Sequence, residues 1–441
     1  MQYAAACEYL RQIQGENCKL SLDNVRRLIA RAPVDIGACR YVQVAGSNGK
    51  GSTSHFIAAI LKAAGWRVGL FTSPHLQDVR ERIRVDGRPV SRRDFACAVS
   101  AARAWCERLL TEGAIANRAT FFETLFLAAL HHFARCRADW AVLEVGLGGR
   151  LDATSTVRPE VTVITNVSLE HTNVLGRTLE AIAREKAGVI RRGVPLVCGC
   201  APGMRAAAVI RAAARRRRAP LSEVFAGRRP LTVEKGSAGY FCRYRNGVGE
   251  HRFLVRLKGR HQARNAAVAV AVVDALRRRG WEVGAAAIGR GIAGMVIPGR
   301  IETIGQRPPL ILDGGHNRAG IQALVDFLRE ERIHGFTLLF GVLRDKLYAD
   351  MARKLAPLAG RVVLSEPESP RALPAEKLRR YFPGLECRVE KDPARALAIA
   401  KKFKKTIIVC GSLYLVGAIR AVALGGKKDG RQAIPRSRKA V

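Results

Sequence analysis

A glycine-rich segment, AGSNGKGS at residues 45–52, follows an apolar run and precedes a helix-like stretch. Its glycines let consecutive backbone N–H groups point at one anion, and the following helix adds the positive end of its dipole. Lys50 can neutralise terminal phosphates, and the Ser52 hydroxyl can ligate Mg²⁺. Gly51 separates these two residues, whereas the usual phosphate loop places Ser or Thr directly after Lys. The segment predicts a nucleotide-phosphate site.

Polar side chains also follow other strand-like runs. Ser73 comes directly after one run, Glu144 lies inside a buried one, and His171 follows a third. Open α/β sheets bind ligands at the carboxyl ends of their strands. A buried carboxylate needs a partner, which makes Glu144 a candidate Mg²⁺ ligand. For His171, a structural role and a role in the site stay equally open.

These motifs lie in a chain whose strand-like and helix-like segments alternate. Strands are expected at residues 41–45, 67–71, 140–145 and 161–166, with a helix at 52–64. The alternation predicts an α/β fold with a doubly wound, mostly parallel sheet in a phosphate-loop domain.

A second α/β series follows near the C-terminus. Strands expected at residues 310–313, 337–342, 361–364 and 407–409 predict a smaller, Rossmann-like domain. We expect the first domain at residues 1–296, with a β-rich segment near 231–257. The second domain is expected at 297–424, followed by a basic, disordered tail at 425–441.

The net charge of the 441-residue chain is +38, from 75 Lys and Arg against 37 Asp and Glu. Such a charge suits a nucleic-acid partner or reflects a general compositional bias. The dense basic runs, at residues 215–218 and from 427, contain no interleaved aromatics for base stacking, which favours the bias. No apolar run is long enough for a membrane span, and the N-terminus does not resemble a secretory signal. We therefore expect a cytoplasmic protein that binds neither membranes nor nucleic acid.

The motifs in order resemble those of the folylpolyglutamate synthase/dihydrofolate synthase family, which are Mur-ligase-like, ATP-dependent, amide-forming ligases. The resemblance covers nearly the whole chain and rests on VAGSNGKGS, LFTSPHL, TFFET, LEVGLGGRLDATS, TNVSLEHTNVLG, LKGRHQARNAA, IPGRIE and LDGGHN. It implies that ATP phosphorylates a pterin or folate carboxylate, and that the amino group of L-glutamate attacks the acyl phosphate. Dihydropteroate, a reduced folate or both are the implied acceptors, in a monomeric enzyme of folate biosynthesis.

The resemblance also implies roles for individual residues. The residues implied to contact ATP are Asn48, Gly49, Lys50, Gly51, Ser52, Asn265, Arg300 and Asp313. The residues implied to hold Mg²⁺, as one or two ions, are Ser52, Ser73, Glu144 and His171. The residues implied to line the pterin side of the pocket are Thr120, Phe121, Phe122, Glu123, Leu151, Asp152 and Ala153. The residues implied to be catalytic are Lys50, Lys186 and His316, with Lys186 carbamylated.

Three residues depart from the family's pattern. Ser47 and Glu170 replace the usual Thr and Asp, and Gly315 replaces the usual Ala. Glu170 is one methylene longer than aspartate, which can shift the neighbouring His171. Two other functions stay open at this point: a Mur-type ligase for a cell-wall precursor, and a basic phosphate-loop protein that binds nucleic acid. The TFFE and GRLDA segments argue against the wall-precursor ligase.

Overall fold

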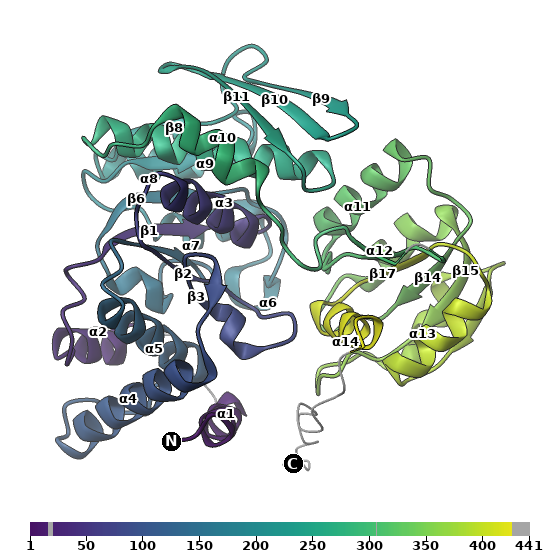
Figure 1. Cartoon of the computed structure of the whole chain (residues 1–441), viewed down its shortest axis with the longest axis horizontal. Coiled ribbons are helices and arrows are strands. Elements are labelled where there is room, and N and C mark those ends of the chain that lie inside the picture. Colours follow the sequence, from purple (N-terminus) through teal and green to yellow (C-terminus); the bar gives the residue numbers. More distant parts are fainter. Residues whose placement is uncertain (16–20, 306, 426–441) are drawn as a thin grey trace. The chain divides into compact units, whose positions relative to one another are not determined.

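The computed structural model of the chain describes residues 1–15, 21–305 and 307–425. Its internal contacts divide the chain into two compact units, whose elements are labelled in Figure 1. The first unit comprises Met1–Arg256 and Gln262–Met295, and the second comprises Leu257–His261 and the chain from Val296 onward. The expected boundary at residues 296–297 lies beside this division, although residues 257–261 group with the second unit. The expected basic tail falls, from residue 426 on, outside the described residues.

The first unit is built on an eight-stranded sheet with the order β4-β3-β2-β5-β1-β6-β7-β8. The six strands from β2 to β8 in this order run parallel to one another. The hairpin β3–β4 joins them antiparallel, at the β2 edge. This arrangement confirms the predicted doubly wound, mostly parallel sheet. The strand bounds are β1 (Arg40–Ala45), β2 (Val68–Phe71), β3 (Ile83–Val85), β4 (Arg88–Pro89), β5 (Trp140–Glu144), β6 (Pro159–Ile164), β7 (Leu196–Cys198) and β8 (Leu221–Glu223).

Helices cover both faces of this sheet, which explains why its central strands are apolar on both sides. In Figure 1, α3 and α10 lie on one side of the strands, and α4 and α5 lie on the other. Leu143 of β5 packs in the core formed with α4 and α5, whereas Ile164 of β6 packs with α7 and α8. The helix bounds are α1 (Tyr3–Gln12), α2 (Asp23–Ala30), α3 (Lys50–Ala63), α4 (Arg92–Thr111), α5 (Phe121–Arg135), α6 (Thr172–Leu175), α7 (Leu179–Ala187), α8 (Arg205–Arg216), α9 (Arg260–Arg278) and α10 (Ala285–Ala293).

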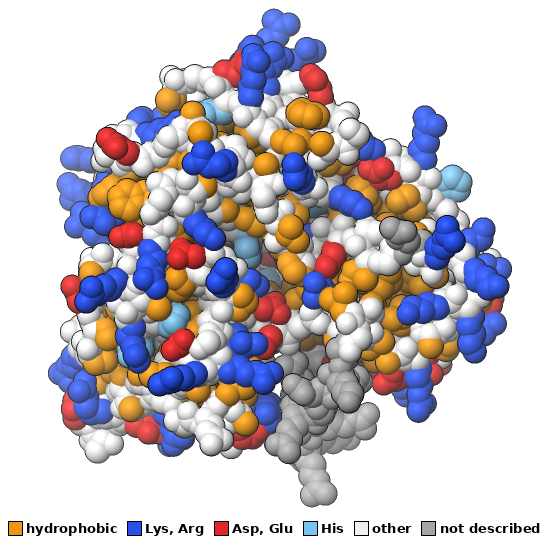
Figure 2. All heavy atoms as spheres, viewed as in Figure 1, with side chains coloured by type: hydrophobic (Ala, Val, Ile, Leu, Met, Phe, Trp, Pro, Cys, Tyr) orange, Lys and Arg blue, Asp and Glu red, His pale blue; other side chains and the backbone are white. Residues whose placement is uncertain are grey.

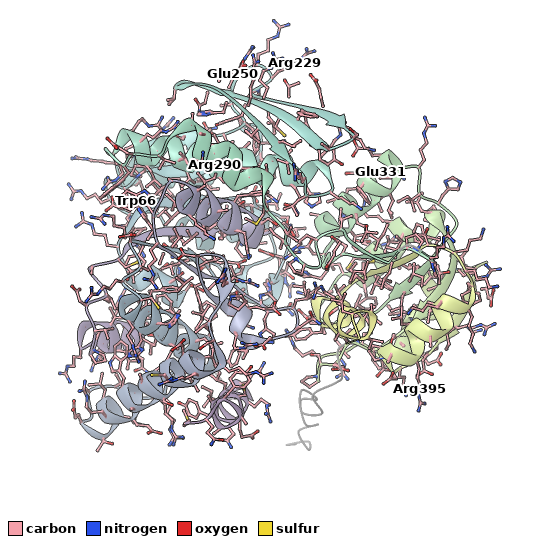
Figure 3. All side chains as sticks on the ribbon, viewed as in Figure 1. Trp66, Arg229, Glu250, Arg290, Glu331 and Arg395 are labelled. Atoms are coloured by element: carbon pink, nitrogen blue, oxygen red, sulfur yellow. The ribbon has the colours of Figure 1, made fainter. Side chains whose placement is uncertain are left out.

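The segment expected to be β-rich forms a separate antiparallel sheet of three strands, β9 (Leu231–Gly236), β10 (Gly239–Asn246) and β11 (Gly249–Val255). Figure 3 labels Glu250 in β11 and Arg229 just before β9. Asp274 of α9 ties this sheet to the rest of the first unit, because its buried carboxylate accepts hydrogen bonds from His251 Nε2 at 2.9 Å and Asn246 Nδ2 at 2.7 Å.

The second unit contains a six-stranded sheet with the order β12-β13-β17-β14-β15-β16. All neighbouring pairs are parallel except β12 with β13. Within the described ranges, no helix of either unit is long and apolar enough to cross a membrane. The element bounds are β12 (Glu302–Ile304), β13 (Leu310–Leu312), α11 (Arg318–Glu330), β14 (Phe336–Phe340), α12 (Tyr348–Leu355), β15 (Ala359–Leu364), β16 (Glu386–Val389), α13 (Pro393–Lys402), β17 (Ile407–Cys410) and α14 (Leu413–Ala423).

Candidate functional site

The phosphate loop joins β1 to α3 in a backbone conformation that requires glycine at two positions. Gly46 has φ 142° and Gly49 has φ 77°. A Cβ at Gly46 would lie 1.9 Å from Thr165 Oγ1, and one at Gly49 would lie 2.3 Å from Asn265 Oδ1. Helix α3 begins directly after the loop, so its first backbone N–H groups face the loop. The predicted ATP contacts Gly49 and Asn265 are therefore neighbours in the first unit.

A second segment, directly after β6, holds the phosphate loop in place. The Asn166 side chain accepts from the Asn48 N–H and donates to the Asn48 carbonyl oxygen, both at 2.9 Å. Thr165 Oγ1 donates to the same carbonyl at 2.7 Å. The Ser168 N–H donates to Ser47 Oγ at 2.9 Å. These bonds fix the direction of the loop's N–H groups before any ligand binds, and such preorganised donors favour anion binding.

Two lysines converge on one carbonyl of the phosphate loop. Lys50 Nζ donates to the Gly46 oxygen at 2.9 Å and to the Ser47 oxygen at 3.3 Å. Lys186, on α7, donates to the same Gly46 oxygen at 2.8 Å and to Glu170 Oε1 at 2.7 Å. Residues from three separate loops and helices thus form one cluster, which we call the lysine–glutamate cluster (Lys50, Glu170 and Lys186).

Burial strengthens the electrostatic interactions within the lysine–glutamate cluster. The side chains of Lys186 and Glu170 are only 1% and 7% exposed. Burial lowers the pKa of Lys186 to about 8, although the carboxylate of Glu170 opposes this shift. Burial alone would raise the pKa of Glu170, but the charges of Lys50 and Lys186 outweigh it and lower the pKa to about 2. Lys186 is therefore a buried amine that loses its proton far more readily than a surface lysine.

Glu144 lies beside the phosphate loop at the end of β5, where the residue is 4% exposed. Its Oε2 accepts a hydrogen bond from the Ser73 N–H at 2.9 Å. A Cβ at Gly51 would lie 3.4 Å from the same oxygen. Ser52, the next residue of α3, is also buried. The predicted residues Gly51, Ser52, Ser73 and Glu144 thus gather at the carboxyl ends of neighbouring strands.

The oxygen donors at this edge fit Mg²⁺. A carboxylate and serine hydroxyls are hard ligands, and Mg²⁺ in proteins usually takes one or two carboxylates plus waters and substrate phosphates. No group of three or more His, Cys, Asp or Glu side chains is placed to hold a metal in the ranges that the structure describes. Waters and substrate phosphate oxygens would complete the coordination. His171 lies exposed at the start of α6, with φ 46°, and its place in a metal set stays a prediction.

Two residues predicted for the pterin side have local structural roles. Thr120 is the N-cap of α5, and its hydroxyl accepts the Glu123 N–H at 3.4 Å. The Glu123 carboxylate accepts the Thr120 N–H in return at 2.8 Å, which completes a capping box. These side chains position the start of α5, which carries Phe121 and Phe122. Any contribution of Thr120 and Glu123 to a ligand site is in addition to this capping.

Asp152 likewise orders a loop. One carboxylate oxygen accepts the N–H groups of Gly146 and Leu147 at 2.9 and 3.1 Å. The other accepts the Thr154 N–H at 3.0 Å and its hydroxyl at 2.6 Å. A carboxylate has about four lone-pair sites, so these four hydrogen bonds occupy the accepting capacity of Asp152. Leu151 is half-buried and Ala153 is buried beside it.

The ring of Phe122 lies against this same loop. A Cβ at Gly146 would lie 2.7 Å from it, and the ring centroid is 5.4 Å from that of Phe71. The guanidinium of Arg82 lies 5.1 Å from the centroid of the Phe121 ring. The structure therefore brings together the two predicted segments, residues 120–123 and 151–153, around aromatic rings suited to stacking.

The second unit gathers its predicted residues at the carboxyl end of β13. Asp313 is 5% exposed and accepts two backbone N–H groups at 3.1 and 2.8 Å. Burial raises its pKa, and the positive charge of Arg300 opposes that rise. A Cβ at Gly314 would lie 3.3 Å from Arg300 Nη1. His316 Nδ1 donates to the Gly314 carbonyl at 2.9 Å, because a carbonyl oxygen only accepts.

Sequence reasoning missed residues that hold these sites in shape. Asn166 and Ser168, which anchor the phosphate loop, lie in the quoted TNVSLEH motif, so the polar run after a strand was the available signal. Glu170 was noted only as a departure from the family pattern. His261 was not predicted at all: burial, assisted by the charge of Arg300, lowers its pKa to about 4 and keeps it neutral near pH 7.

Comparison with known proteins matches both units to family models. The model of the Mur ligase middle domain matches residues 44–273, and that of the Mur ligase glutamate ligase domain matches residues 299–413.

Curated relatives are about one-third identical to this chain over the aligned residues. The folylpolyglutamate synthase of Lacticaseibacillus casei is 36% identical over 88% of this chain and 91% of its own length. The dihydrofolate synthase/folylpolyglutamate synthase of Escherichia coli is 33% identical over 97% of both chains. A probable bifunctional folylpolyglutamate synthase/dihydropteroate synthase of Haloferax volcanii is 36% identical over 95% of this chain. The chain spans about half, 50%, of the length of that bifunctional relative.

Solved structures resemble the whole chain. The Escherichia coli FolC complex with DHPP and ADP has a TM-score of 0.83 at 30% identity, covering 96% of this chain and 98% of that one. The Mycobacterium tuberculosis folylpolyglutamate synthase complexed with ADP and AMPPCP has a TM-score of 0.87 at 28% identity, covering 96% and 99%.

Proposed function

The chain belongs to the folylpolyglutamate synthase/dihydrofolate synthase family of Mur ligases and is an ATP-dependent ligase, and we propose that it adds L-glutamate to dihydropteroate, to a reduced folate, or to both. The phosphate loop carries the proposal, because Asn265, Glu144 and Lys186 all meet it at one edge of the sheet. The relatives favour this activity over a ligase for cell-wall precursors. The monomeric state and the cytoplasmic location expected from the sequence stay predictions.

The proposed reaction has two steps. A carboxylate oxygen of the pterin substrate attacks the γ-phosphorus of ATP, and the bond from that phosphorus to the bridging oxygen of ADP breaks. The amino nitrogen of glutamate then attacks the acyl carbon, so that a C–N bond forms and inorganic phosphate leaves. The nitrogen gives up a proton to reach the amide. Both steps build negative charge on phosphate oxygens, which positive groups must stabilise.

The residues around the phosphate loop suit this charge build-up. The loop's N–H groups and the N-terminus of α3 bind phosphate oxygens, and Lys50 lies close enough to turn from the loop carbonyls to a terminal phosphate. Glu144, Ser52 and Ser73 would hold Mg²⁺ next to them, with His171 as a further predicted ligand. When bound, Mg²⁺ would supply additional positive charge beside the phosphate groups.

We propose that Lys186 is carbamylated, as the family resemblance implies, and its chemistry supports this proposal. An uncharged amine attacks carbon dioxide to form a carbamate with loss of one proton, and a pKa of about 8 leaves a sizeable uncharged fraction near neutral pH. The carbamate would turn a cation into an anion beside Glu170, a residue with which Lys186 now pairs. Lys50 and a nearby Mg²⁺ ion would offset the two negative charges.

The second unit supplies Arg300, Asp313 and His316, for which we propose contacts with ATP and the transferred phosphoryl group. Arg300 is a fixed cation suited to phosphate oxygens. His316 presents a ring whose Nδ1 is held by the Gly314 carbonyl, so its orientation is set before substrate binds.

Parallel assays with dihydropteroate and tetrahydrofolate, each with ATP, Mg²⁺ and glutamate, test the function directly. We expect ADP, phosphate and a product longer by one glutamate with at least one acceptor, and none of these with Lys50→Ala. Omitting Mg²⁺ should stop turnover. Absence of a glutamylated product with both acceptors would reject the proposal.

Carbamylation needs its own test. Intact-protein mass spectrometry at pH 8 with bicarbonate should show one added carboxyl group on the wild type and none on Lys186→Ala. That variant should be inactive and regain partial activity with acetate, which can occupy the position of the carbamate. Full activity of the variant without acetate would exclude a role for Lys186.

A further inference from the structure

A second basic site lies in the first unit, away from the phosphate loop. It is a cavity of about 570 Å³ whose lining includes five arginines and no acidic residue. We call it the arginine cavity and define it by Arg26, Arg150, Arg158, Arg191 and Arg192. Its volume falls within the range of roughly 300–1,000 Å³ that is common for small-molecule sites.

Two arginines of the arginine cavity lie at the opposite end of the large sheet's strands from the phosphate loop. Arg158 directly precedes β6, and Arg192 lies shortly before β7, so both mark the amino ends of these strands. The phosphate loop follows the carboxyl end of β1, which runs parallel to β6. A ligand held by Arg158 and Arg192 would therefore lie apart from the phosphate loop, whereas Arg150 adjoins Leu151 of the predicted pterin segment and pairs with Glu185, the neighbour of Lys186.

The positive charge of this cavity is only partly compensated. Arg150 pairs with Glu185 at 3.0 Å, and Arg26 lies 3.8 Å from the exposed Asp23. Arg158 and Arg192 are exposed, and neither has an acidic partner in the part of the chain that the structure describes.

Arg191 is the best-ordered group of the arginine cavity. Its two terminal nitrogens donate to the backbone carbonyls of Gly188, at 3.0 Å, and Ser155. Both acceptors are neutral, so the guanidinium is held in place without losing its charge. Burial lowers the pKa of Arg191, and the neighbouring charges of Arg217 and Arg26 add to this effect.

We propose that the arginine cavity binds a small polyanion that carries at least two closely spaced phosphate or carboxylate groups. Guanidinium groups bind both kinds of oxyanion in a bidentate manner, and several of them facing one cavity gain most from a ligand with several charges. A monovalent anion would leave most of the like-charge repulsion uncompensated. Phosphorylated metabolites and oligo-γ-glutamates both have this chemistry.

Titration calorimetry on the Lys50→Ala chain tests the proposal, because that background weakens phosphate binding at the ATP site. Inorganic tripolyphosphate and tri-γ-glutamate are the probes, each at physiological ionic strength. We expect saturable binding of one equivalent of at least one probe. Adding Arg158→Ala and Arg192→Ala should weaken it about tenfold or more, because charge-assisted bonds contribute about 1.5–3 kcal/mol each.

The matched control removes the same charge elsewhere. Arg228→Ala with Arg229→Ala alters two exposed arginines on the loop before β9 (Figure 3 labels Arg229), and should change the affinity less than twofold. An equal loss in both double variants would mean that net charge alone attracts the probes, and no loss in either would place the probe elsewhere. Both results, or a failure of both probes to bind, would overturn the proposal. The probe that binds more tightly shows whether the cavity prefers a ligand with phosphate groups or one with carboxylate groups.

Discussion

At the scale of single residues, the site depends on glycines that have no room for a side chain. Gly49 combines φ 77° with a Cβ position only 2.3 Å from Oδ1 of Asn265, whose Nδ2 donates a hydrogen bond to Gln262 Oε1. Gly65, at the end of α3, has φ 100° but nothing within 4 Å of its Cβ position. Comparing alanine substitutions at Gly49 and Gly65 therefore distinguishes the effect of a left-handed backbone from that of a steric clash at the phosphate loop.

We predict that Gly49→Ala loses most of its ATP affinity, because the methyl group displaces Asn265 or the loop itself. Gly65→Ala should cost about 1–2 kcal/mol of folding free energy from its left-handed backbone and keep normal ATP binding. Nucleotide titration and chemical denaturation of both variants provide the measurement. Equal ATP affinity in the two variants would contradict the steric role of Gly49.

The lysine–glutamate cluster predicts an unusual pH dependence of stability. Glu170→Gln removes the partner of a lysine that is 1% exposed, and breaking a buried ion pair from one side costs about 3–5 kcal/mol. The folded-state pKa of Lys186 is already lowered to about 8, below the unfolded value of about 10.4, so the unfolded chain binds more protons between them. The contribution of Lys186 to the free energy of unfolding therefore rises with pH between about 8 and about 10.4.

Denaturation of the ligand-free proteins from pH 6 to 10 checks this prediction. The Glu170→Gln variant should recover part of its lost stability relative to the wild type as the pH rises toward 8, because loss of the carboxylate lowers the pKa of Lys186 further. The control Glu8→Gln, which removes the partner of Arg11 in a much more exposed pair, should change stability by less than about 1 kcal/mol at every pH. A variant curve parallel to that of the wild type would show that Lys186 does not titrate as described.

At the scale of elements, hydrogen bonds join the phosphate loop to the segment after β6. Asn166 makes two hydrogen bonds to the backbone of Asn48. Elsewhere, Asn24 makes the same kind of pair, to the Asn117 carbonyl at 2.8 Å and the Ala116 N–H at 3.3 Å. Only the first pair sets the direction of the loop's N–H groups.

We predict that Asn166→Ala raises the KM for ATP about tenfold or more, with a smaller effect on the KM for the pterin substrate. The reason is that a loop with its anchor removed must be ordered when ATP binds, which uses binding free energy. Asn24→Ala should lose similar stability, about 1–2 kcal/mol, and keep its KM for ATP. Steady-state kinetics of the two variants decide, and an unchanged KM in Asn166→Ala would reject the role of this anchor.

At the scale of the whole molecule, the charge of +38 is spread rather than concentrated. Figure 2 shows Lys and Arg side chains distributed over the visible face, with acidic side chains among them. A net positive field draws anionic substrates toward the protein without selecting among them. The arginine cavity gathers five such charges around a defined volume.

We predict that kcat/KM for ATP, at constant free Mg²⁺, falls several-fold between roughly 50 and 300 mM KCl while kcat changes little. Salt screens long-range attraction over about 10 Å at 0.1 M and leaves closely bound groups less affected. Stopped-flow binding of a fluorescent ATP analogue should show the loss in the association rate. A loss confined to the dissociation rate would assign the effect to direct contacts instead.

Much of this architecture was predictable because its signals are local. The apolar runs of β1, β5 and β6 and the glycines between β1 and α3 lie in short stretches, and the structure confirms the parallel sheet that they predict. Shorter strands such as β7, β8, β12 and β16 were not predicted. Each has only three or four residues, and β8, β12 and β16 lack a fully buried face, so their pairing depends on neighbours far along the chain.

By itself, the sequence determined the phosphate loop, the order of the elements and the family, because glycine spacing and ordered motifs are properties of adjacent residues. Only the tertiary structure decided which side chains act together. It joined Lys50, Glu170 and Lys186 across 136 positions, and it assigned Thr120 and Asp152 to local hydrogen bonds. The physical reason is that burial, long-range hydrogen bonds and the resulting pKa shifts arise only when distant segments pack and exclude water.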